Sequence, residues 1–218
     1  MSKMTGGALA ARVLKNDGVK YLFGLVGGHI YPVLEGCVEM GIDVIDVRHE
    51  ESAAHMAEGW AFATGKPGVC IGTAGPGFTN MLTGIANSFA GGTPILAMAG
   101  HASIHEFDTG ALQDFNQIDV VKPMTKFART VYQSNRIPEY MGMALRHATS
   151  GRPGPAFIEI PMDLAFGEVD VDSLYLPDCH RMQSPPAGNP DEVAKALQMI
   201  EKAKKPIIIA GSGIWWSQ

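Results

Sequence analysis

The sequence has 218 residues, 46% of them hydrophobic and 18% charged, which is typical of a soluble α/β protein with one complete core and part of a second. The net charge of −5 and the lack of a Lys/Arg run argue against a nucleic-acid partner, and no apolar run is long enough to cross a membrane. Three cysteines without a CxxC pair, and no signal-peptide core in residues 1–20, lead us to expect a reduced, cytoplasmic protein.

Hydrophobic periodicity predicts helices and strands that alternate along the chain as far as residue 160. The predicted helices span residues 8–14, 32–40, 53–61, 81–89 and 138–149, and the predicted strands span 21–25, 42–47, 69–72, 94–99, 126–131 and 156–160. Strands that alternate with helices pair in parallel and are covered on both faces. We therefore expect an α/β fold built on a doubly wound, six-stranded parallel sheet with helices on both faces.

Beyond Pro161 the periodicity stops, and acidic residues and prolines predict a linker. A predicted helix over 191–202 and a predicted buried strand over 206–210 follow it. The predicted division is residues 1–165 for the first domain, 166–188 for the linker and 189–218 for the beginning of a central, incomplete α/β domain. Because a lone helix and strand cannot bury both their faces, we expect the complement from a larger protein or from another polypeptide.

Glu50 lies where a predicted strand passes into a predicted helix, within Arg48-His49-Glu50. Ligands of open parallel sheets bind at this carboxyl edge. Small and apolar neighbours therefore make Glu50 a candidate for a buried functional acid. The alternative is that Glu50 and Glu51 are first-turn acids that complement the helix dipole, and the local pattern by itself favours that interpretation.

Two glycine turns and one polar loop lie at the same predicted edge. Val26-Gly27-Gly28-His29 and Gly75-Pro76-Gly77 each follow a strand, and their glycines allow the backbone to approach a ligand closely. The alternatives are a plain turn with a helix cap for the second segment, and for His29 a cap of the helix that begins near Tyr31. The loop over residues 100–117 is long for a connection inside a domain, which favours a functional loop.

Motifs for dinucleotide and metal sites are incomplete. Gly75-x-Gly77 has Asn80 at the third glycine position, so a dinucleotide site is not predicted. Ala53 occupies the position where a zinc-binding HExxH helix needs its second histidine. His101 and His105 have no third ligand in register, so we expect solvent-facing loop histidines and no metal ligand in this chain.

Five segments together resemble one family. They are Phe23–Gly28, Arg48-His49-Glu50, Gly59-Trp60-Ala61, Gly75–Asn80 and Gly151–Pro155. Their order and spacing are similar to the amino-terminal, pyrimidine-binding domain of thiamine-diphosphate enzymes of the acetolactate synthase, 2-hydroxyacyl-CoA lyase, oxalyl-CoA decarboxylase and benzaldehyde lyase type. The resemblance covers about residues 4–165, and residues 205–213 are similar to the start of that family's central domain.

The resemblance implies thiamine diphosphate as the cofactor and Glu50 as its activating acid. In the family this glutamate hydrogen-bonds the aminopyrimidine ring, and the neighbouring imino nitrogen then removes the thiazolium C2 proton. The other residues that the resemblance places against the cofactor are Val26, Gly28, Gly75, Pro76 and Asn80.

The resemblance also implies two catalytic residues on the substrate side. Gln113 corresponds to a glutamine that faces the reacting centre, and Leu112-Gln113-Asp114 is closer to the acyl-CoA lyases than to acetolactate synthase. His29 departs from the small or aliphatic residue usual in acetolactate synthases and is similar to benzaldehyde lyase, where a histidine faces the substrate. His29 is therefore a candidate acid–base or substrate-binding group, with the helix cap as its alternative.

The family holds the diphosphate and Mg²⁺ in a further domain with a Gly-Asp-Gly…Asn motif, which this sequence lacks. The implied partner is a polypeptide or chain segment that carries this domain, in a homo- or hetero-oligomeric dimer or tetramer, and the isolated chain is expected to be inactive. The implied function is a carbon–carbon lyase or carboligase acting on a 2-hydroxyacyl-CoA or a 2-oxo acid. An acetolactate synthase-like carboligase and a non-catalytic scaffold or regulatory domain are the alternatives.

Overall fold

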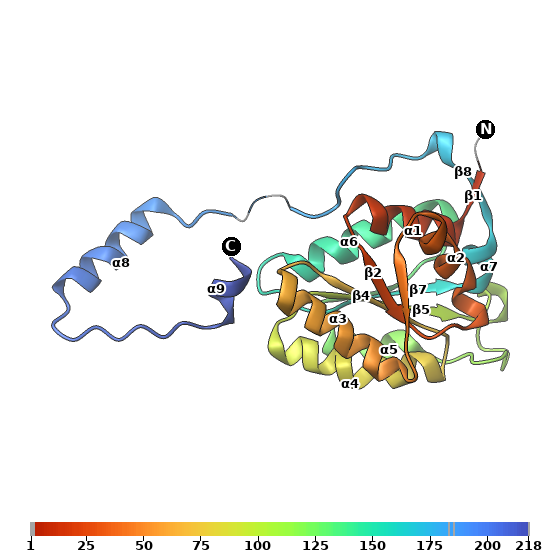
Figure 1. Cartoon of the computed structure of the whole chain (residues 1–218), viewed down its shortest axis with the longest axis horizontal. Helices are drawn as coiled ribbons and strands as arrows, with labels where there is room; N and C mark the ends of the chain where they lie inside the picture. Colours follow the sequence, from red (N-terminus) through yellow and green to blue (C-terminus); the bar gives the residue numbers. More distant parts are fainter. Residues whose placement is uncertain (1–2, 183, 185, 218) are drawn as a thin grey trace. The chain divides into compact units, whose positions relative to one another are not determined.

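The computed structural model describes residues 3–182, 184 and 186–217, and the chain divides into two units, Met1–Arg181 and Met182–Gln218. The first unit contains a six-stranded parallel sheet with the strand order β3-β2-β4-β5-β7-β6 (Figure 1). Its strands are β2 (Tyr21–Gly24), β3 (Asp43–Asp46), β4 (Gly68–Gly72), β5 (Ile95–His101), β6 (Phe127–Thr130) and β7 (Ala156–Pro161). The predicted α/β fold with a six-stranded parallel sheet is confirmed.

Helices cover both faces of this sheet (Figure 1). One face carries α1 (Gly6–Asn16), α2 (Tyr31–Glu39) and α6 (Ile137–Thr149), and the other carries α3 (Glu50–Thr64), α4 (Pro76–Gly91) and α5 (Gln117–Val121). The remaining helical segments of this unit are α7 (Met162–Phe166) and the 3-10 turns η1 (Gly28–Ile30), η2 (Ile104–Glu106), η3 (Lys122–Met124), η4 (Ser134–Arg136) and η5 (Val171–Ser173).

Two hydrophobic cores lie on opposite faces of the sheet, because successive side chains of a strand point to opposite sides. In β4, Val69 and Ile71 belong to the core beneath α1, α2 and α6, whereas Cys70 belongs to the core beneath α3 and α4. The strands β4, β5 and β7 are buried along their whole length. This double burial explains why their sequences are mostly apolar, with His101 and Glu159 as the exceptions, rather than alternating patterns.

Several elements differ from the sequence-based expectation. A two-stranded antiparallel pair forms between β1 (Lys3–Thr5) and β8 (Glu168–Asp170), in the segment predicted as a linker. Helix α4 begins at Pro76, five residues earlier than predicted, because Gly75 caps it and proline fits the first turn. The predicted 100–117 loop ends where α5 begins, and neither α5 nor α7 was predicted.

The second unit contains α8 (Pro190–Lys202), which confirms the predicted helix, and α9 (Ser212–Trp216). The strand predicted over 206–210 is wrong: these residues form no strand in the part of the chain that the structure describes, and Ile207, Ile208 and Ile209 are more than 80% exposed. A strand needs a hydrogen-bonded neighbour, and apolar sequence alone does not supply one. The assignment of residues 189–218 to a second domain stays a prediction.

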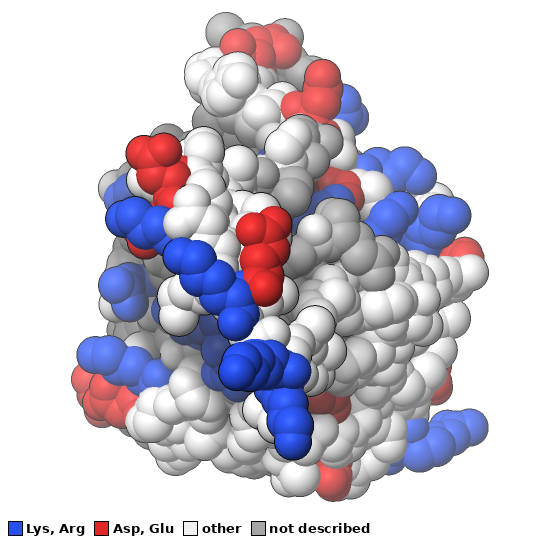
Figure 2. Space-filling model, turned by 90° about the vertical axis from the view of Figure 1, so that its left-hand side faces the viewer, with Lys and Arg blue, Asp and Glu red and all other residues white. Residues whose placement is uncertain are grey.

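Charged side chains of both signs share the face shown in Figure 2, where Lys and Arg lie among Asp and Glu. Among the helices that the structure describes, none is both long and apolar enough to cross a membrane.

A buried carboxylate ties the end of the first unit back to α1. Asp17 accepts hydrogen bonds from the His180 ring Nδ1 at 2.7 Å and from Arg181 Nε at 3.2 Å, and its side chain is 1% exposed. Burial alone would raise the pKa of Asp17, but hydrogen bonds and charge from His180, together with a hydrogen bond from Cys179, hold the pKa below its ordinary value. Asp17 therefore stabilises the fold most strongly when it is ionised.

Asp17→Asn is expected to lower the free energy of unfolding by about 3 kcal/mol near neutral pH, because it leaves His180 and Arg181 without their buried partner. The folded-state pKa lies below that of the unfolded chain, so this contribution is complete above the unfolded pKa of about 3.9 and disappears as the pH falls through the folded value. Urea unfolding of both proteins across this range measures the difference. Asp43→Asn, at an exposed position, is the control, and a difference that does not shrink in acid would contradict the prediction.

Candidate functional site

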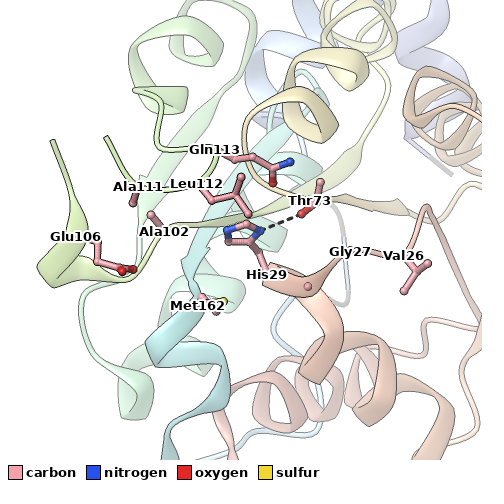
Figure 3. Close-up of a pocket in the computed structure, with 11 residues that line it drawn as sticks. Val26, Gly27, His29, Thr73, Ala102, Glu106, Ala111, Leu112, Gln113 and Met162 are labelled. Carbon is pink, nitrogen blue, oxygen red and sulfur yellow. Dashed lines mark hydrogen bonds between the residues drawn. The ribbon is translucent and has the colours of Figure 1, made fainter. Parts of the chain in front are cut away.

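A cavity of ≈ 550 Å³ opens at the carboxyl edge of the sheet, where the connections after parallel strands meet (Figure 3). Its walls come from the segments that follow β2, β4, β5 and β7. The lining residues are Val26, Gly27, Gly28, His29, Thr73, Ala102, Glu106, Ala111, Leu112, Gln113 and Met162. Four of the predicted site residues, Val26, Gly28, His29 and Gln113, therefore line one cavity.

His29 is buried in the η1 turn, and its Nδ1 lies 3.2 Å from Thr73 Oγ1 (Figure 3). Helix α2 has Ile30 as its N-cap and no side-chain cap, so the alternative that His29 caps this helix is wrong. Burial lowers the pKa of His29 below its ordinary value, although a hydrogen bond with the Leu112 backbone and the charge of Glu106 oppose the shift. The ring is therefore neutral at neutral pH and can exchange a proton with a bound group.

Gln113 reaches the cavity from the loop between β5 and α5, and its backbone is in the left-handed region with a φ of 62°. This loop lies against the turn that follows β4. A Cβ added to Gly75 would lie 3.0 Å from Gln113 Cβ and 3.2 Å from the Gln113 carbonyl oxygen. The close approach explains why a glycine with a φ of 58° stands at position 75.

Glu50 is the first residue of α3 and is only 6% exposed. Asn80, on α4, donates a hydrogen bond from Nδ2 to Glu50 Oε2 at 2.9 Å, and no other described side chain hydrogen-bonds this carboxylate. The other oxygen, Oε1, faces Gly77, where an added Cβ would lie 3.3 Å away. Glu50 is thus a first-turn acid, as the dipole interpretation requires, but it is buried and oriented by Asn80.

Glu51 differs from Glu50 although it belongs to the same helical turn. Its side chain is 43% exposed and lies near the rings of His49 and His55. His49 caps the helix by accepting a hydrogen bond from the Glu51 amide at 3.2 Å. Glu51 therefore fits the interpretation of a dipole-complementing surface acid.

Glu50 does not line the 550 Å³ cavity, but Thr73 connects the two places. A Cβ on Gly77 would lie 2.7 Å from Thr73 Cγ2, and Thr73 itself lines the cavity beside His29. Thr73, Gly77 and Glu50 thus form one continuous wall, with Pro76 in the first turn of α4 behind it. Thr73 was missed by the sequence analysis, although its position directly after a buried strand is the same signal that identified Glu50.

A second polar network, also missed, lies beneath the loop that carries Gln113. Gln117 Nε2 donates to Glu159 Oε2 at 2.7 Å, and Thr130 donates to Glu159 Oε1 at 2.8 Å. Burial raises the pKa of Glu159, against the opposing effects of Gln117, Thr130 and the charge of His101. No sequence pattern distinguishes a buried glutamine at this position from a solvent-facing one.

His101 corrects one expectation. It was predicted to face solvent, but it is the last residue of β5 and is buried, with Nε2 3.0 Å from the Phe115 carbonyl oxygen. His105 is exposed, as predicted. Among the described residues, no group of three or more His, Cys, Asp or Glu side chains is arranged to hold a metal ion.

Comparison with known proteins shows the family to which the chain belongs. The family model for the thiamine pyrophosphate enzyme, N-terminal TPP binding domain, matches residues 4–120, which is more than half of the chain. The chain is 35% identical to a probable acetolactate synthase large subunit from Methanocaldococcus jannaschii, over 97% of the chain and 36% of that protein. It is also 35% identical to acetolactate synthase isozyme 2 large subunit from Escherichia coli and to 2-hydroxyacyl-CoA lyase 2 from Danio rerio, each covered over 38% of its length.

The chain therefore belongs to the family of thiamine pyrophosphate enzymes and matches their N-terminal cofactor-binding domain. The resemblance drawn from the five sequence segments is confirmed. Family membership implies thiamine diphosphate as the cofactor. The chain spans a little over a third of the length of these relatives.

Proposed function

We propose that this chain supplies the pyrimidine-binding half of the active site in a thiamine-diphosphate-dependent carbon–carbon lyase or carboligase. The observation that carries the proposal is the buried Glu50 carboxylate, which is oriented by one hydrogen bond from Asn80 and has a free oxygen facing a glycine. An amino-pyrimidine ring needs a carboxyl group that can hold a proton and a flat neighbouring wall. Glu50 provides the first, and the backbone of Gly75-Pro76-Gly77 provides the second, so the residues fit the cofactor.

In this proposal each residue around the Glu50 carboxylate has a defined role. Glu50 holds a proton at Oε1 toward the pyrimidine ring, while Asn80 fixes the carboxylate by binding Oε2. Burial keeps water from competing for that proton. Val26 and Gly28 form the opposite wall, where Gly28 has no atom within 4 Å of an added Cβ and leaves room for the bound group. When bound, the cofactor supplies a carbon nucleophile that attacks a carbonyl carbon.

The substrate side of the proposed site is the cavity beside His29 and Gln113. His29 is neutral and shares a hydrogen bond with Thr73, so it can give a proton to or take one from a substrate oxygen. The Gln113 amide can hold the same oxygen through its NH₂ group. We propose a 2-hydroxyacyl-CoA or a 2-oxo acid as the substrate, with the acyl-CoA lyase reaction first and an acetolactate synthase-like ligation second.

The diphosphate and Mg²⁺ are proposed to bind a domain outside this chain, contributed by another chain segment or by a partner subunit in a dimer or tetramer. The support is that the chain covers a little over a third of its relatives. We also propose a reduced, cytoplasmic location, in line with the three free cysteines.

Titration calorimetry with thiamine diphosphate and Mg²⁺ tests the proposal. The assembly of this chain with the proposed diphosphate-binding domain is expected to bind the cofactor, and residues 1–218 alone are expected to bind at least about 100-fold more weakly, a loss of about 2.8 kcal/mol. An assembly that binds no cofactor would contradict the proposed function and support the scaffold alternative. Equal binding by the isolated chain would contradict the divided site.

A further inference from the structure

Gln117 is completely buried, and each polar atom of its amide has a partner. Oε1 accepts a hydrogen bond from the Gly75 backbone N–H at 3.1 Å. Nε2 donates to the Gly100 carbonyl oxygen at 2.9 Å and to Glu159 Oε2 at 2.7 Å. Because Gly75 offers a donor and the other two offer acceptors, the amide can face only one way.

These bonds join the carboxyl ends of four neighbouring strands. Gly75 follows β4, Gly100 lies in β5, Glu159 lies in β7, and Thr130, which donates to Glu159 Oε1 at 2.8 Å, ends β6. Glu159 is itself 2% exposed, so its two hydrogen bonds are shielded from water. The amide of Gln117 is therefore held from the sheet side by groups that belong to rigid strands.

Gln117 also terminates the loop that carries Gln113. Gln113 lies four residues before it, and its backbone lies close to Gly75, where an added Cβ would lie 3.2 Å from the Gln113 carbonyl oxygen. Both positions have a positive φ, 62° for Gln113 and 58° for Gly75. Two residues with backbone conformations that L residues rarely adopt thus lie side by side. Gln117 hydrogen-bonds Gly75 directly, and it is connected to Gln113 by the three residues between them.

We propose that Gln117, held by Glu159, is a positioning residue that fixes the Gly75 turn against the Gln113 loop. It thereby keeps the cofactor side and the substrate side of the proposed site in a fixed relative position. The inference rests on the proposed function, because it assigns Gln117 a task in binding the cofactor at that site. Gln117 touches neither the cavity nor Glu50. Its effect passes through the backbone of Gly75 on the cofactor side and of Gln113 on the substrate side.

The first test needs no cofactor. In the complete assembly, Gln117→Met keeps the shape of the side chain and removes all three hydrogen bonds. Hydrogen–deuterium exchange of the segments 73–79 and 108–117 is expected to become at least about tenfold faster, because both segments lose their shared anchor. Glu159→Gln keeps an amide oxygen toward Gln117 and is expected to exchange close to the wild-type rate.

Asn87→Leu is the matched control. Asn87 also donates its amide to a buried carboxylate, Glu58, at 2.9 and 2.8 Å, farther along α4 and away from the cavity. Because Asn87 is exposed and Gln117 is buried, Asn87→Leu is expected to lower the melting temperature less than Gln117→Met and to leave exchange in the two segments unchanged. If Gln117→Met does not fold, Gln117→Asn takes its place, because the shorter amide cannot reach Gly75 and Glu159 together.

The second test measures binding and turnover. Gln117→Met is expected to raise the thiamine diphosphate dissociation constant at least about tenfold and to lower kcat, whereas Asn87→Leu changes neither. A folded Gln117 variant with the cofactor affinity, kcat and exchange rates of Asn87→Leu would overturn the inference alone. A wild-type protein that binds no thiamine diphosphate would overturn both this inference and the proposed function.

Discussion

Glu50→Gln is expected to reduce kcat of the complete assembly, in which the proposed diphosphate-binding domain is present, by about 1,000-fold, within the range that a positioned acid–base group contributes. Glutamine has the same shape, and its amide oxygen can still accept the hydrogen bond that Asn80 gives to Glu50. The amide nitrogen cannot release a proton and take it back, so proton exchange with the pyrimidine ring stops. Steady-state kinetics and NMR exchange of the thiazolium proton of the bound cofactor measure the two effects.

Glu51→Gln is the control for this substitution, because Glu51 is the next acid of the same turn and is partly exposed. It is expected to turn over at the wild-type rate. Both variants should melt at nearly the wild-type temperature, which would separate chemistry from stability. Wild-type turnover and proton exchange in Glu50→Gln would contradict the role assigned to Glu50.

His29→Gln is expected to lower kcat/KM by about 100-fold while thiamine diphosphate binds with near wild-type affinity. Glutamine can replace the hydrogen bond to Thr73 but cannot carry a proton between pH 5 and 8. Because burial lowers the pKa of His29, its neutral form persists below pH 6.5, so the acid limb of the wild-type pH profile should lie below that value. The same limb should be absent in His29→Gln.

His105→Gln, on the exposed η2 turn, is the control and is expected to keep the wild-type profile. Full activity of His29→Gln, with an unchanged acid limb, would show that His29 only hydrogen-bonds its surroundings. In that case the proton must come from another group at the cavity.

The sheet could be predicted because its central strands carry their own signal. The runs of β4, β5 and β7 are apolar except for His101 and Glu159, and strands covered on both faces require such a mostly apolar pattern. The β1–β8 pair could not be predicted in this way, since each strand has three residues and the partners are 165 positions apart. The Ile207–Ile209 run shows the reverse case, an apolar strand pattern that pairs with no strand among the described residues and stays exposed.

The residues of the candidate site were harder to predict from the sequence than the strands of the sheet. The local sequence pattern gave only a weak signal for Glu50, Gly75 and Asn80, because first-turn acids and glycine turns are common. These residues became candidates for the site because five segments together resemble one family. Gln117 and Glu159 carry no such signal. A glutamine in a polar loop and a glutamate in an apolar strand are recognised as partners only when the fold brings them within 2.7 Å. Long-range polar pairs of this kind depend on topology rather than on any local pattern.

The small-residue contact between α3 and α4 has a consequence for how such a site can evolve. An added Cβ on Gly84 would lie 2.5 Å from Ala54 Cβ, so the two helices that carry Glu50 and Asn80 cannot shift without collision. His29 and Gln113 lie instead in a short turn and a loop, and neither belongs to the two hydrophobic cores. Under the proposed function, selection can alter these two residues at less cost to the core than the contact between α3 and α4, which would allow one inherited chemistry to be redirected to new substrates.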